Sequence, residues 1–125
     1  MARATLGVII GNREFFPDAL VTEARADVLK VFEAMDITPI LVDPTATKLG
    51  GVETRTEAKA CAALFDEHRA EIEGVVVVLP NFGDEKGVAD TVRLSGLDVP
   101  ILVQAYPDDV TAFTLDRRRD SFCGK

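Results

Sequence analysis

Four polar residues could bind a ligand, and each lies at or shortly after the end of a short apolar run: Arg13, Asn81, Asp84 and Gln104. A guanidinium, two amides and a carboxylate together offer many hydrogen-bond donors and acceptors. Sugars and other hydroxyl-rich ligands are held by groups of this kind. We therefore predict a hydroxyl-rich ligand for these residues, provided that the fold brings them together.

The apolar runs themselves predict β-strands. They are rich in Val and Ile and do not alternate with polar residues. Such continuous runs are typical of strands buried on both faces of a sheet. The predicted strands span residues 5–10, 37–42, 74–79 and 100–105.

The segments between the runs show helical spacing of apolar residues. Residues 17–35 predict the first helix, with Pro17 in its first turn. Thr54 and Glu57 fit a capping box that starts a second helix. Residues 84–95 predict a third, shorter helix that stops at a glycine.

Alternating strands and helices predict an α/β domain with a parallel sheet and helices on both faces. Right-handed crossovers favour the strand order 2-1-3-4, a three-layer, doubly wound arrangement of the flavodoxin-like type. Arg13 and Asn81 would then flank the crevice at the carboxyl ends of the first and third strands, where such sheets bind ligands. No apolar run follows residue 105, so we expect the single domain, residues 1–125, to lack a fifth strand.

Composition argues against several classes of protein. Asp and Glu number 21 against 14 Lys and Arg, for a net charge of −7, which disfavours nucleic acid and anionic membranes as partners. One His and two Cys cannot supply the four ligands of a structural zinc site. The first turn after residue 10 reads GNREFF rather than a glycine-rich dinucleotide or phosphate loop. With no run long enough for a membrane span, we expect a cytoplasmic protein.

Each candidate residue also has a purely structural interpretation. Arg13 could pair with Glu14 or Asp84 instead of a ligand. Asn81 could only shape a turn, because asparagine tolerates unusual backbone angles. Asp84 and Glu85 could mark the start of a helix rather than act as an acid–base pair.

Four motifs taken together resemble a known family. The segments GNREFFP, LPNFGDE, QAYPDD and RRRDSFCGK occur in this order along the chain. They resemble the amino-terminal region of the L-fucose/L-arabinose isomerase family, in its fucose-isomerase-like branch. The resemblance covers essentially the whole chain.

The resemblance implies an aldose–ketose isomerase that uses manganese, with the metal held by residues of later domains. It also implies that the amino-terminal domain makes subunit contacts and closes part of a neighbouring subunit's sugar pocket. Arg13 matches a family arginine that reaches that pocket, and Asn81, Asp84 and Gln104 are further candidate sugar contacts. We therefore expect a domain fragment with no catalytic or metal-binding residues, no cofactor of its own and no activity alone.

A fragment of this kind would expose surfaces that the rest of the enzyme covers. We expect the strand at 101–105 to be an open edge, and Phe113, Leu115 and Phe122 to be exposed. Such an edge predicts self-association, to a dimer. Two alternatives remain open at this point: a free-standing module that binds a sugar-like small molecule, and a purely structural flavodoxin-like scaffold.

Overall fold

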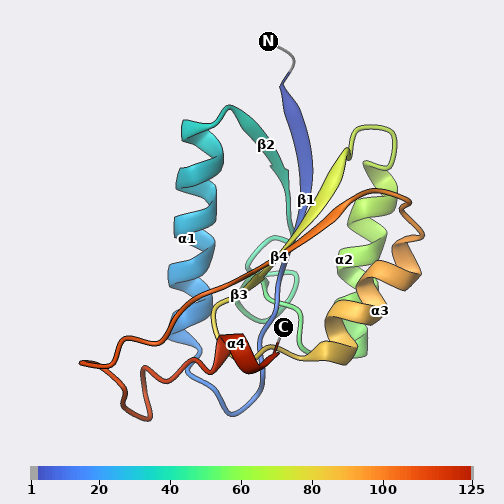
Figure 1. Cartoon of the computed structure of the whole chain (residues 1–125). Helices are drawn as coiled ribbons and strands as arrows, with labels where there is room; N and C mark the ends of the chain where they lie inside the picture. Colours follow the sequence, from blue (N-terminus) through green and yellow to red (C-terminus); the bar gives the residue numbers. More distant parts are fainter. Residues whose placement is uncertain (1–2, 125) are drawn as a thin grey trace.

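A parallel four-stranded sheet forms the centre of the computed structural model, which describes residues 3–124 (Figure 1). The order is β2-β1-β3-β4 and every pair is parallel. This confirms the predicted α/β fold and its 2-1-3-4 order. The strands are β1 (Ala4–Ile10), β2 (Ile37–Ile40), β3 (Gly74–Leu79) and β4 (Ile101–Ala105).

Helices cover the sheet on both faces, giving the three predicted layers. Helix α1 lies on one side of the sheet, and α2 and α3 pack together on the other (Figure 1). The short elements η1 and α4 were not predicted from the sequence. The helical bounds are α1 (Ala19–Ala34), η1 (Lys48–Gly50), α2 (Arg55–Glu67), α3 (Glu85–Ser95) and α4 (Ser121–Gly124). Within residues 3–124, none of these helices is long and apolar enough to cross a membrane.

Two apolar cores form because alternate residues of the central strands point to opposite faces. Ile9 and Val77 pack with Phe65 of α2 on one face. Val8 and Val78 belong to the other core, beneath α1. Each face of β1 and β3 is therefore buried by a different helix layer, as their continuous apolar sequences predict.

Strand β4 differs from that expectation. Ile101, Leu102 and Val103 are 46%, 63% and 47% exposed. The prediction that this run is buried on both faces is therefore wrong, because β4 pairs only with β3 and forms the edge of the sheet. The expected open edge at this strand is confirmed, and so is the exposure of Phe113, Leu115 and Phe122.

The helix starts follow local chemistry that the sequence predicts. Thr54 and Glu57 form the reciprocal capping box of α2, with both hydrogen bonds at 3.2 Å. The Asp84 carboxylate accepts from the backbone N–H of Gly87 at 2.9 Å and so caps α3. Helix α1 starts later than expected, because its N-cap is Asp18 rather than a residue before Pro17.

The segment after β2 returns to the end of β1. The N–H of Val52 donates to the carbonyl of Ile10 at 2.7 Å, and the N–H of Asn12 donates to the carbonyl of Val52 at 3.2 Å. These bonds form a short parallel bridge beyond the strand proper. The residues after Val52 are thereby held beside those that follow β1.

The chain after β4 also folds back onto the sheet. The Arg119 guanidinium donates to the carbonyl of Pro80 at 2.9 Å and lies 4.6 Å from the centre of the Tyr106 ring. The Tyr106 hydroxyl donates to Asp27 of α1 at 3.1 Å. Desolvation, and secondarily that carboxylate, raise the pKa of Tyr106 to about 12. This contact joins the C-terminal segment to α1 and to the turn after β3.

Two glycines with positive φ give a matched test of the turn after β3. Gly83 has φ +77°, and a Cβ there would lie 2.8 Å from Cδ2 of the buried Leu79. Gly96 has φ +60°, but its nearest atom would be 3.9 Å away, on Arg69. We expect Gly96→Ala to cost about 1 kcal/mol from backbone strain alone. Gly83→Ala should cost about 2–3 kcal/mol, because overpacking is added.

Urea unfolding of both variants and the wild-type chain measures this difference. Equal losses in the free energy of unfolding would contradict the crowding at Gly83.

Candidate functional site

A pocket of about 460 Å³ lies at the carboxyl edge of the sheet, where the residues after β1 and β3 meet those before α2. Ligands of open α/β sheets bind at this position, next to the point where the strand order reverses. The pocket is lined by Arg13, Glu14, Phe15, Lys48, Glu53, Thr54 and Asp84.

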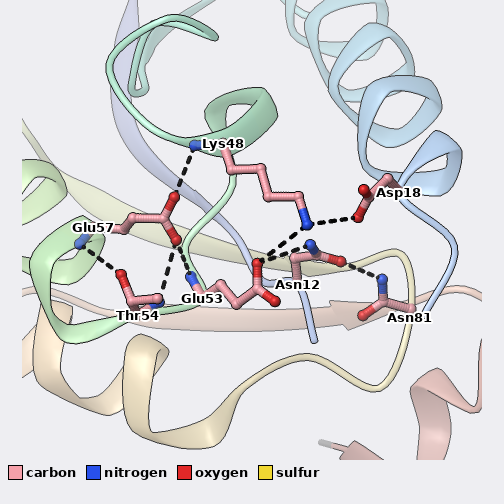
Figure 2. Close-up of polar contacts among 7 residues, drawn as sticks. All are labelled: Asn12, Asp18, Lys48, Glu53, Thr54, Glu57 and Asn81. Atoms are coloured by element: carbon pink, nitrogen blue, oxygen red, sulfur yellow. Dashed lines mark hydrogen bonds and ion pairs between the residues drawn. The ribbon is translucent and has the colours of Figure 1, made fainter. Parts of the chain in front are cut away.

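Two buried asparagines form a hydrogen-bond network with the pocket residue Glu53. The Asn81 side-chain amide donates to Asn12 Oδ1 at 2.7 Å, and the Asn12 amide donates to Glu53 Oε2 at 3.3 Å (Figure 2). Asn81 Oδ1 accepts from the N–H of Gly83 at 3.0 Å. Both asparagines are almost completely buried, where unpaired amides would be costly. This network joins the ends of β1 and β3 to the segment before α2.

Arg13 lies at the rim of the pocket. Its Nη1 donates to Glu85 Oε2 at 2.8 Å and to the carbonyl of Gly83 at 3.2 Å. The guanidinium also lies 4.9 Å from the centre of the Phe82 ring. The sequence suggested Glu14 or Asp84 as the partner of Arg13, but in the structure its partner is Glu85. A backbone hydrogen bond, and secondarily Arg13, hold the pKa of Glu85 below its ordinary value.

Lys48 is the second cationic side chain that lines the pocket. Its Nζ lies 3.2 Å from Asp18 Oδ1 and 3.9 Å from Glu53 Oε2 (Figure 2). The backbone N–H of Lys48 donates to Glu57 Oε2 at 2.7 Å, which fixes η1 to the start of α2. Its hydrogen bond with Asp18 raises the pKa of Lys48.

Glu53 is a poorly solvated carboxylate of the pocket, with a side chain 11% exposed. Its Oε2 faces Asn12 and Lys48, whereas its buried Oε1 makes no hydrogen bond with any described residue. Burial raises the pKa of Glu53, and Lys48 opposes that shift. A carboxyl oxygen without a donor is suited to accept a hydrogen bond after a small rearrangement.

The structure brings three of the four predicted site residues to this region. Arg13 and Asp84 line the pocket, and Asn81 lies buried behind it. Gln104 lies elsewhere, in an apolar groove of about 450 Å³ between β4 and α1 that also contains Tyr106. Alternate residues of β4 face opposite sides of the sheet, so Gln104 faces α1. Their roles as sugar contacts stay predictions.

Lys48 and Glu53 were not predicted as site residues. Neither lies at the end of an apolar run, and the bridge at Val52 that positions them is formed by residues far apart in sequence. The one sequence feature that could have indicated Glu53 is the capping box at Thr54, because it places Glu53 directly before the start of a helix.

The pocket does not fit the manganese that the resemblance implies for a complete enzyme. Within residues 3–124, no three His, Cys, Asp or Glu side chains are grouped to hold a metal ion. The one histidine of the sequence, His68, lies beyond the C-terminal end of α2, whereas the pocket lies at the start of that helix. The charged and polar side chains that line the pocket offer hydrogen bonding and charge pairing.

The strand order and the polar pocket at the carboxyl edge define the class: a flavodoxin-like α/β domain with a polar pocket at its switch point. The chain belongs to the fucose/sulfoquinovose isomerase N-terminal domain family, because the model of that family matches residues 7–125. This confirms the resemblance seen in the sequence. Comparison with curated proteins found no match, and comparison with solved structures found none either.

The raised pKa of Glu53 has a measurable effect on stability. The folded protein holds the Glu53 proton more tightly than the unfolded chain, whose ordinary value is 4.5. The free energy of unfolding therefore loses a contribution as pH rises above that value. Glu53→Gln removes this titration, so we expect the stability of wild type relative to the variant to fall between about pH 4 and pH 7.

Urea unfolding of both proteins at the two pH values measures the change. Glu33→Gln, on the exposed side of α1, removes one carboxylate from the surface and serves as the control. If the stability of wild type relative to Glu53→Gln instead rose with pH, the ionised carboxylate would be stabilised, not penalised, by its surroundings.

Proposed function

We propose that the chain is the amino-terminal domain of an aldose–ketose isomerase for sugars of the L-fucose/L-arabinose type. The observation that carries this proposal is the family match across residues 7–125. In the complete enzyme, manganese bound outside these residues would polarise the oxygens of the sugar during proton transfer. The enzyme would act in the cytoplasm.

The role of this domain would be to supply part of the sugar pocket. Arg13 offers guanidinium donors at the rim, and Glu14 and Asp84 offer acceptors for hydroxyl groups. Phe15 is 80% exposed beside them, which leaves much of its ring accessible for packing on the C–H face of a sugar. These groups orient a ligand rather than react with it, which supports a domain without turnover of its own.

A titration of the isotopically labelled chain with L-fucose and L-arabinose, with and without manganese, tests the sugar-binding role. We expect amide NMR shifts clustered at Arg13, Glu53 and Asp84, and a loss of at least about tenfold in affinity in Arg13→Ala, because a charge-assisted hydrogen bond disappears. Arg93→Ala, on the exposed side of α3, is the matched control. One-dimensional proton spectra of the same samples report turnover, since a ketose would add new sugar signals.

The titration also separates this proposal from its two alternatives. Turnover by the chain alone, lost in Arg13→Ala, would contradict an inactive domain. A well-dispersed spectrum without shifts would favour a structural scaffold. Tight binding that no further domain improves would favour a free-standing sugar-binding module.

The second proposed role is contact between subunits through β4. This strand leaves one edge of backbone groups without a neighbouring strand in the sheet, and its apolar side chains are exposed on both faces. Such edges pair readily with another strand. A two-fold arrangement would place β4 beside the same strand of a second copy and extend both sheets.

We expect Leu102→Lys to weaken self-association by at least about tenfold, because a charge on an edge strand opposes pairing. Sedimentation equilibrium over a range of concentrations measures this. Leu94→Lys, an exposed leucine of α3, controls for the added charge. A wild-type chain that stays monomeric at high concentration would contradict the β4 contact.

A further inference from the structure

We infer that the pocket selects an uncharged, hydroxyl-rich sugar and rejects a sugar that carries a sulfonate. The inference rests on the proposed function, because it concerns the ligand of the same pocket. It addresses a difference within the family itself, whose name covers fucose, a neutral sugar, and sulfoquinovose, a sulfonated one. The two ligands differ by one full negative charge.

Both cations of the pocket are already paired within the chain. Arg13 is hydrogen bonded to Glu85 at 2.8 Å. Lys48 lies 3.2 Å from Asp18 and 3.9 Å from Glu53. A sulfonate would have to displace one of these carboxylates or approach beside it. The pairs therefore leave little positive charge for an anionic ligand.

Acidic side chains also lie at the helix N-termini around the pocket, although Asp18 accepts no capping hydrogen bond from α1. Helix N-termini attract anions, and three helices begin near this edge of the sheet. Asp18 precedes α1, the Thr54–Glu57 capping box starts α2, and Asp84 caps α3. Each start thus carries an acidic group from the chain itself.

The lining as a whole is acidic. Two cationic and three anionic side chains line the pocket, and the partners Asp18 and Glu85 add two more carboxylates next to it. A sulfonate would meet this excess of negative charge. A neutral sugar would instead find carboxylate oxygens, such as those of Glu14 and Asp84, as acceptors for its hydroxyl groups.

Paired NMR titrations of the chain with L-fucose and sulfoquinovose test the inference. We expect sulfoquinovose to bind the wild-type pocket at least about tenfold more weakly than L-fucose, from charge repulsion in a half-exposed site. The double variant Asp18→Asn, Glu85→Gln frees Arg13 and Lys48 from these partners. We expect the ratio of the two dissociation constants to shift toward sulfoquinovose by about tenfold.

A matched control changes the net charge by the same amount elsewhere. Asp66→Asn, Glu71→Gln removes two exposed carboxylates at the far end of α2 and leaves Arg69 without its partner Asp66. We expect no change in the ratio. A ratio that moves equally in both double variants would show an effect of net charge alone and would overturn the role of the pocket pairs.

Inorganic sulfate tests the charge pairing without any sugar. We expect sulfate to leave the amide signals of Arg13 and Lys48 unchanged in the wild-type chain and to shift them in the Asp18→Asn, Glu85→Gln variant. Sulfate shifts at these positions in wild type, or sulfoquinovose binding as tight as that of L-fucose, would overturn the inference and leave the proposed function intact. Absence of binding by either sugar would contradict the proposed function, while the sulfate result still decides the charge pairing.

Discussion

The backbone pairing at the end of β1 is the interaction on which the pocket depends. Gly11 donates to the carbonyl of Val78 on one side, at 2.9 Å, while Val52 and Ile10 are joined on the other, at 2.7 Å. The end of the strand is thereby held between β3 and a segment that enters from beyond β2. Side chains that follow these backbone positions meet because the hydrogen bonds leave them little freedom to separate.

The side-chain amides of Asn12 and Asn81 add a hydrogen-bonded pair next to that backbone pairing. Two buried amides would be costly if left without partners, but each is hydrogen bonded. The Asn12 amide donates a hydrogen bond to Glu53, and the Asn81 amide oxygen accepts one from the backbone N–H of Gly83. The pocket carboxylate Glu53 is therefore held by a buried amide that is itself hydrogen bonded.

Local patterns predicted most of the fold, and non-local contacts account for what they missed. The strand order follows from alternating elements, and the capping box of α2 can be recognised from Thr54 and Glu57 alone. Arg13 and Asp84 were found because strand ends share one edge of a parallel sheet. Lys48 and Glu53 were missed because the bridge at Val52 joins segments far apart in sequence. Gln104 was grouped with the others because proximity to the edge says nothing about which face a side chain takes.

Because Tyr106 contacts Arg119, the intrinsic fluorescence of the protein depends on the position of its C-terminal segment. The sequence contains one tyrosine and no tryptophan, so all intrinsic fluorescence excited near 280 nm comes from Tyr106, apart from a weak phenylalanine signal. Its hydroxyl donates to a carboxylate and its ring lies under a guanidinium, and both neighbours alter its emission. Release of the C-terminal segment from the sheet would therefore change the only bright chromophore of the chain without any added label.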